Sequence, residues 1–188
     1  MLTKSILSGS RKCLQKADFQ SVTVSEIART AGIGVSSLYE YFSGKTDVFK
    51  ALLDDQIKAH LKLLSCRIEE LTNESDFNEV IVSMFDDLYA RRAYMSNHVR
   101  ALPHDFAWGL LIRSRLRASE LLAEKIEPIR PDLPFEELKS RSFFFINCFM
   151  DGIHSSALAE RENIPVDLVR VKKYLFQVAI SLLITRTG

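Results

Sequence analysis

Apolar side chains recur at steps of three and four residues along almost the whole chain, and this spacing constrains the fold more than any other feature. Such spacing places apolar side chains on one face of an α-helix, whereas strands need alternation with a period of two. The clearest run extends over more than twenty residues and consists of Phe49, Leu52, Leu53, Ile57, Leu61, Leu64, Ile68 and Leu71. The sequence therefore predicts an all-α fold.

Turn-forming residues divide this pattern into separate helices, which we expect over about 48–71, 77–95, 106–127, 135–160 and 166–185. The stretch EPIRPDLP before Phe135 reads as a loop, because each proline removes a backbone donor, and Pro165 suits the first turn of the last helix. We expect a small N-terminal head at 1–46, built from three helices, and a larger helical domain at 47–188.

The head contains a strong signal for a helix start and a helix stop. Thr23 and Glu26 have the spacing of a capping box, and Val22 and Ile27 have that of a hydrophobic staple. The helix that begins here ends at Gly32, which can adopt the left-handed conformation without a Cβ penalty.

A second short helix is expected directly after this stop. Gly34 can act as its N-cap, so that the helix begins at Val35, and two short helices joined by a glycine-containing turn form a helix-turn-helix. The side chains expected between these helices and a preceding one are Ile6, Leu7, Leu14, Phe19, Ile27, Ile33, Leu38 and Phe42.

The second helix leaves an unusual set of side chains outside: Val35, Ser36, Ser37, Tyr39 and Tyr41. An exposed methyl group and tyrosine hydroxyls suit the major groove of DNA, where they can meet thymine methyl groups and phosphates. Residues 1–50 carry seven basic and four acidic side chains, a positive balance that a polyanion-binding head needs. A three-helix packing unit without a ligand is the alternative.

Residues 5–53 resemble the N-terminal DNA-binding domain of the TetR family of transcriptional regulators. The resemblance is carried by Phe19, Thr23, Val24, Ile27, Ala28, Ala31, Gly32, Leu38, Tyr39, Phe42 and Lys45. It implies that Thr23, Tyr39, Tyr41 and Lys45 contact DNA phosphates and that Val35, Ser36 and Ser37 face base edges. It also implies a divergent second domain that binds a small-molecule effector and forms a homodimer.

Three positions depart from the family pattern, namely Gly34, Val35 and Glu40. The second helix consequently has no Lys, Arg, Asn or Gln, the residue types that make bidentate base contacts. Base readout is therefore expected to depend on methyl contacts, hydroxyls and DNA shape.

The second domain offers candidate effector contacts in large aromatic side chains and in two polar residues within an apolar run. Asn147 and Asp151 lie four residues apart in FFFINCFMDG, and buried groups of this kind need partners, which a ligand, water or a second subunit could supply. The candidate set is Phe85, Tyr89, Trp108, Phe144, Asn147 and Asp151, and it suggests a mostly apolar effector.

The last helices are apolar on more than one side, which requires burial on both sides, either in the centre of the domain or against a second subunit. We expect a second subunit to cover Phe149, Ile153, Leu168, Val171, Leu175, Val178 and Leu182.

Other classes of protein receive less support. Asp151 and His154 could form an acid–base or metal-binding pair, but the sequence shows no third ligand and no phosphate loop or nucleophile elbow. Three widely spaced cysteines and the lack of a long apolar run predict a cytoplasmic protein without a membrane segment, metal or cofactor. The sequence thus predicts a non-enzymatic, DNA-binding repressor relieved by a small molecule. The alternative is a helical ligand-binding dimer without sequence-specific DNA binding.

Overall fold

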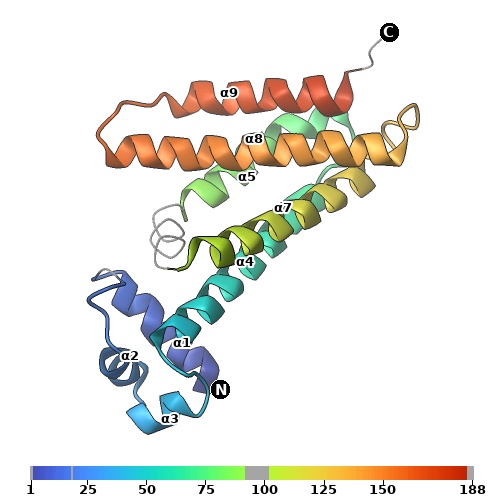
Figure 1. The fold of residues 1–188 in the computed structure, drawn as a ribbon. Coiled ribbons are helices and arrows are strands. Elements are labelled where there is room, and N and C mark those ends of the chain that lie inside the picture. Colours follow the sequence, from blue (N-terminus) through green and yellow to red (C-terminus); the bar gives the residue numbers. More distant parts are fainter. Residues whose placement is uncertain (1, 18, 92–101, 186–188) are drawn as a thin grey trace. The chain divides into compact units, whose positions relative to one another are not determined.

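The computed structural model describes residues 2–17, 19–91 and 102–185, and every regular element in these ranges is a helix (Figure 1). The chain divides into two compact units, the first formed by residues 1–58 with 93–111 and the second by 59–92 with 112–188. Two long helices, α4 (Lys45–Glu69) and α7 (His104–Ile126), contribute residues to both units. The predicted all-α fold is confirmed, and the first unit contains the expected head together with the beginnings of α4 and α7.

The first unit is built around the helix-turn-helix. Helix α1 (Leu2–Leu14) packs against α2 (Val24–Ala31), which packs against α3 (Val35–Tyr39). All eight predicted core side chains belong to its hydrophobic cluster, so the predicted packing is confirmed. Ile6, Leu14, Ile27 and Leu38 are buried, and Leu7, Phe19, Ile33 and Phe42 are partly buried.

The contact between α1 and α2 is close because α1 carries a glycine at its centre. A Cβ atom added to Gly9 would lie 2.9 Å from the backbone nitrogen of Ala31. Only a residue without a side chain therefore allows the two helices this approach.

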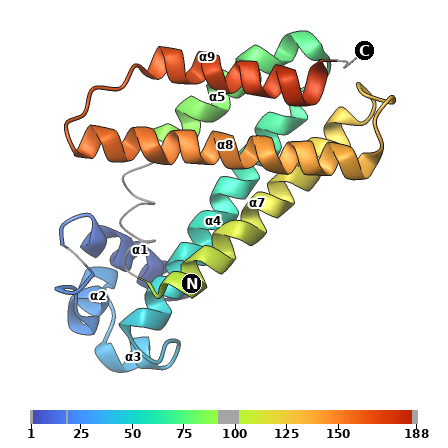
Figure 2. The same ribbon diagram turned by 45° about the horizontal axis from the view of Figure 1, so that its top comes forward.

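The second unit combines the remaining parts of α4 and α7 with η1 (Glu74–Asp76), α5 (Phe77–Tyr89), α8 (Phe135–Arg161) and α9 (Leu168–Ala179). Helix α9 continues as a π-helical turn, η2 (Ile180–Ile184). Helix α5 packs against α8 and α9, which lie side by side (Figures 1 and 2). The predicted helices agree with these elements, except that α5 ends at Tyr89 whereas we expected a helix to residue 95, and residues 92–95 lie outside the described ranges.

A buried arginine fixes the C-terminal turn of the second unit. The guanidinium group of Arg130, which is 0% exposed, forms a bidentate pair with Asp132 at 2.8 and 2.7 Å. Its Nη1 also donates to the carbonyl oxygens of Leu183 and Thr185, both at 3.1 Å. The loop after α7 is thereby tied to η2. Within the described residues, no helix has the length and apolar composition to cross a bilayer.

Candidate nucleic-acid interface

The N-terminus of α2 is fixed by the predicted capping box. The backbone N–H of Glu26 donates to Thr23 Oγ1 at 3.2 Å, and the backbone N–H of Thr23 donates to Glu26 Oε2 at 2.8 Å. These bonds from Thr23, the backbone one foremost, lower the pKa of Glu26. The carboxylate is consequently charged at neutral pH and committed to the helix end.

The turn between α2 and α3 has the geometry that the glycines predict. Gly32 has φ = 71° and ψ = 32°, and the N–H of Ile33 donates to the carbonyl of Ala28 at 3.0 Å. Gly34 is the N-cap of α3 and leaves its first turn without a side-chain cap. The backbone alone therefore sets the direction of α3.

Helix α3 presents a mixed apolar and hydroxyl surface. Leu38 is 0% exposed, whereas Val35, Tyr39 and Tyr41 are exposed by 38%, 54% and 53%. Ser36 and Thr23 are exposed as well, and Ser37 is half-buried. Five of the seven predicted DNA contacts thus lie on α3 or directly after it, Thr23 lies at the N-terminus of α2, and the contacts themselves stay a prediction.

Lys45, the seventh residue, is half-buried and has partners within the head. Its Nζ donates to the carbonyl oxygens of Phe19, Gln20 and Val22 at 3.0, 3.1 and 3.1 Å and lies 4.7 Å from the centre of the Phe19 ring. An ammonium group has three protons, and these carbonyls use all three. In this structure Lys45 holds the loop between α1 and α2, a role that the sequence analysis missed.

The six candidate effector residues do not form one site. Phe85 is buried and stacks on Tyr89 with ring centres 5.3 Å apart, and the Tyr89 hydroxyl contacts Glu160 at 3.2 Å. Trp108 belongs to the first unit, is 49% exposed and stacks on His104, and Phe144 is 58% exposed on α8.

Asn147 and Asp151 share a partner from the same chain. Arg115 Nη1 donates to Asn147 Oδ1 and Nη2 donates to Asp151 Oδ1, both at 2.8 Å, while the Asn147 amide donates to the carbonyl of Phe143 at 2.7 Å. The Arg115 side chain is only 12% exposed. Its position, three residues before the buried Ala118, places it on the inner face of α7, a signal that could have identified it.

The predicted dimer residues are mostly used within their own unit. Phe149, Ile153 and Leu175 are buried in its hydrophobic core, and Leu168, Val171, Val178 and Leu182 pack against that core while partly buried. These contacts lie within the subunit, and a dimer interface through the seven residues stays a prediction. Large apolar side chains exposed on or beside α8 and α9 are Phe144, Leu158, Ile164, Val169 and Tyr174.

Among the described residues, no three His, Cys, Asp or Glu side chains are grouped as a metal site would require. Of the pair considered for acid–base chemistry, Asp151 is bound to Arg115.

Comparison with known proteins identifies the head and the fold. Residues 6–52 match the family model of bacterial regulatory proteins of the tetR family. No curated protein matches the sequence significantly. Among solved structures, the fatty acid degradation regulator FadR from Bacillus halodurans has a TM-score of 0.67 at 18% identity, covering 96% of this chain and 94% of its own.

Two further structures have the same fold. A TetR-family transcriptional regulator from Streptomyces coelicolor has a TM-score of 0.67 at 15% identity, with 97% of this chain and 100% of that chain covered. The TetR-family repressor AlkX from Dietzia sp., implicated in biodegradation of n-alkanes, has a TM-score of 0.62 at 15% identity, with 97% and 95% covered.

Proposed function

We propose that the protein is a homodimeric repressor, because residues 6–52 match the family model of bacterial regulatory proteins of the tetR family and the chain shares its fold with solved TetR-family regulators. It binds a palindromic operator and leaves it when a small, mostly apolar effector binds. A two-fold dimer with one helix-turn-helix per subunit requires two half-sites about one helical turn, or a multiple of it, apart.

The observation that carries this proposal is the exposed surface of α3. Val35 and Tyr39 are exposed on this short helix, which follows the Gly32 turn and has Leu38 as its one buried side chain, and Tyr41 is exposed just after it. Together with the hydroxyls of Ser36 and Ser37, these exposed side chains offer methyl and hydroxyl groups to a partner. A major groove is such a partner.

Base recognition by α3 would differ from the usual pattern. The helix offers one methyl-bearing side chain, Val35, and the hydroxyls of Ser36 and Ser37, instead of the side chains that form bidentate base contacts. We therefore expect a strong dependence on DNA shape and flexibility. The same absence of basic side chains favours the second candidate function, a ligand-binding dimer without sequence-specific DNA binding.

The dimer is supported by apolar surface on the second unit. Phe144 and Leu158 on α8 and Val169 and Tyr174 on α9 are exposed by 43% to 78%. An isologous contact through these helices would bury them against the same residues of a second copy.

The proposed effector follows from the interior of the second unit and from its structural neighbours. Phe85, Tyr89 and Phe149 form an aromatic group, with Phe85 and Phe149 ring centres 6.3 Å apart. The structural neighbour FadR is a regulator of fatty acid degradation, and the neighbour AlkX is implicated in biodegradation of n-alkanes. Both support an acyl or alkyl effector, whose coupling to DNA binding would typically be about 1–3 kcal/mol.

The test is selection of randomised duplex DNA by the purified protein, followed by sequencing at two salt concentrations. We expect a palindromic consensus whose affinity falls with salt, and Tyr39→Ala should weaken binding about 10-fold or more. Ile164→Ala removes an equally exposed apolar side chain in the loop before α9 and should leave binding unchanged. Failure to enrich any sequence would favour the second candidate function. Addition of a fatty acid to the complex should release the DNA.

A further inference from the structure

The lysines and arginines that the structure describes in the first unit fall into two groups. Four are engaged inside the unit: Lys45 with three carbonyls, Arg11 with Asp55 at 3.3 Å, Lys58 with Asp54 at 2.6 Å, and Lys50 with Asp47 at 3.9 Å. Within the described part of the chain, no side-chain ion pair or hydrogen bond is found for Lys4, Lys12, Lys16 and Arg29, although Arg29 interacts electrostatically with Glu26.

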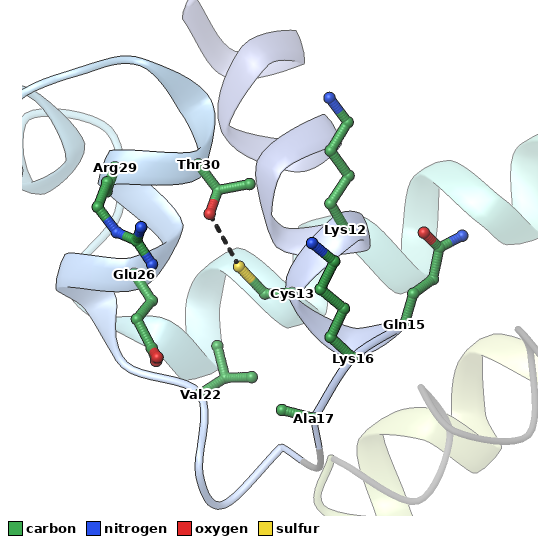
Figure 3. A pocket seen from close by; sticks show the side chains of 9 residues that line it. All are labelled: Lys12, Cys13, Gln15, Lys16, Ala17, Val22, Glu26, Arg29 and Thr30. Carbon is green, nitrogen blue, oxygen red and sulfur yellow. Dashed lines mark hydrogen bonds between the residues drawn. The ribbon is translucent and has the colours of Figure 1, made fainter.

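Three of these four basic side chains line one pocket between the end of α1 and α2. Lys12 and Lys16 border it from the α1 side and Arg29 from the α2 side (Figure 3). The pocket has a volume of about 290 Å³, near the lower limit for sites of small ligands. Its other lining residues are Cys13, Gln15, Ala17, Val22, Glu26 and Thr30.

The pocket keeps a positive balance at neutral pH. Glu26 is its single acidic lining residue, and that carboxylate already accepts the N–H and the hydroxyl of Thr23 at 2.8 and 3.0 Å. The Cys13 thiol donates to Thr30 Oγ1 at 3.5 Å, which ties α1 to α2 across the pocket wall. The lining therefore carries two lysines and one arginine against one carboxylate, with which Arg29 also interacts electrostatically.

We propose that this pocket binds a phosphate group, and that a phosphate of the DNA backbone occupies it in the complex. The second part rests on the proposed function. Helix α3 carries no basic side chain, and the three protons of Lys45 are donated to carbonyls. A head that binds DNA needs cations to displace counterions from phosphates, and three of the four described basic side chains of the first unit that lack an ion pair or hydrogen bond line this pocket.

The position of the pocket agrees with this assignment. Val22 and Glu26, two of its lining residues, flank Thr23, the N-cap of α2. The N-terminus of an α-helix carries partial positive charge, so a phosphate close to Thr23 gains from the helix as well as from the side chains. Thr23 is itself a predicted phosphate contact, and the pocket extends that contact along the same backbone.

The first arm of the test measures DNA binding. The triple variant Lys12→Gln, Lys16→Gln, Arg29→Gln removes the pocket charges while keeping good helix formers. Its matched control is Lys62→Gln, Arg113→Gln, Lys173→Gln, which removes the same charge from exposed second-unit residues without ion pairs to described residues. For a backbone phosphate, the slope of log K against log [salt] should become shallower by about 0.9 in the pocket variant alone. The Kd should rise about 10- to 100-fold, as expected for lost charge-assisted contacts.

The second arm separates a DNA phosphate from a free one. Trp108 is the sole tryptophan of the chain and lies in the first unit, so its fluorescence follows the unfolding of that unit. Inorganic phosphate and glycerol phosphate are added without DNA, against sodium chloride of equal ionic strength. Stabilisation of the wild type and the control, but not of the pocket variant, would identify a free phosphate ester as the ligand, even with an unchanged salt slope.

An unchanged slope together with no phosphate stabilisation would overturn the proposal. If the wild type selects no DNA, the proposed function fails, and the phosphate arm still decides whether the pocket binds phosphate. Circular dichroism of all variants confirms that each is folded before either arm is interpreted.

Discussion

The two compact units differ in how many of their basic side chains pair with carboxylates among the described residues. In the second unit, arginines and lysines from α4, α7, α8 and α9 pair with carboxylates of the same unit, including Arg67 with Asp87 and Arg115 with Asp151. Among the described lysines and arginines of the first unit, three of eight pair with a carboxylate, Lys45 binds carbonyls instead, and three of the remaining four line one pocket. Ion pairs are thus more frequent in the second unit, and in the first unit a group of three basic side chains stays available for a ligand.

The first unit has fewer internal ion pairs among its described residues and is held together by contacts that involve its backbone. The capping box closes α2, Lys45 binds three carbonyls, and Gly9 lets α1 approach the backbone of α2. If this contrast is real, removing an ion pair should matter most in the second unit, and disturbing a backbone contact should matter most in the first.

The largest effect is expected at Arg130. Arg130→Ala leaves the carbonyls of Leu183 and Thr185 without their buried donor and breaks the pair with Asp132. We expect a loss of roughly 3–5 kcal/mol in the free energy of unfolding, measured by denaturant titration and circular dichroism. Arg161→Ala, which removes an exposed pair with Glu162, should cost less than about 1 kcal/mol. Equal small losses would show that ion pairs do not hold the second unit.

The protonation of His60 shows how a positive charge without a carboxylate partner affects the stability of the second unit. Burial, with a smaller contribution from Arg91, lowers the pKa of His60 from 6.5 to about 4. The unfolded chain therefore gains a proton below pH 6.5 that the folded chain accepts only near pH 4, so stability is lost as the pH falls through this window. The loss at pH 4 should reach roughly 3 kcal/mol relative to pH 8.

His60→Gln isolates this contribution from that of the carboxylates. The variant should be less sensitive to acid than the wild type between pH 6.5 and 4 when unfolding is followed by circular dichroism. Parallel pH profiles for the two proteins would mean that His60 is solvated and that the second unit tolerates an unpaired charge.

The sequence predicted those features that are encoded within a few residues. The capping box needs Thr23 and Glu26 three positions apart, and the left-handed turn needs one glycine, so local rules located α2, the turn and α3. Helix periodicity predicted the fold class and most helix boundaries for the same reason.

Features that depend on distant partners escaped the sequence analysis. Lys45 binds carbonyls 23 to 26 residues earlier, and Arg115 bonds Asn147 and Asp151 at separations of 32 and 36 residues. Leu175 shows the same limit. An apolar stripe indicates that one side of a helix is buried, but it does not identify what buries it, and Leu175 packs into the core of its own unit. The pocket was missed because Lys12, Lys16 and Arg29 converge only when α1 packs on α2.

Lys45 is the next most sensitive position and distinguishes a backbone contact from a phosphate contact. Lys45→Met keeps the aliphatic stem but removes three donors to the α1–α2 loop, which should cost roughly 2 kcal/mol of stability in the first unit. The unfolding transition followed by Trp108 fluorescence should shift, while the salt slope of DNA binding should not. Lys4→Met serves as the control with an unengaged lysine. A slope shallower by about 0.9 without loss of stability would instead assign Lys45 to a DNA phosphate.

The smallest effect concerns packing, where the two units should respond with opposite sign to the same substitution. Gly9→Ala places a Cβ 2.9 Å from the backbone nitrogen of Ala31, which cannot move aside without shifting α2. The cost of overpacking should exceed the gain in helix propensity, so the free energy of unfolding should fall by roughly 1–2 kcal/mol.

Gly152→Ala in α8 is the matched substitution in the second unit. The added Cβ meets only the flexible side chain of Leu175 at 3.4 Å and should stabilise the second unit by about 0.5–1 kcal/mol. Because both glycines lie inside helices, the gain in helix propensity is the same for both substitutions. The difference between their changes in unfolding free energy therefore reports the atoms that each added Cβ meets. Stabilisation by both substitutions would mean that α1 and α2 are not held in backbone contact, and the contrast between the units would then rest on charge only.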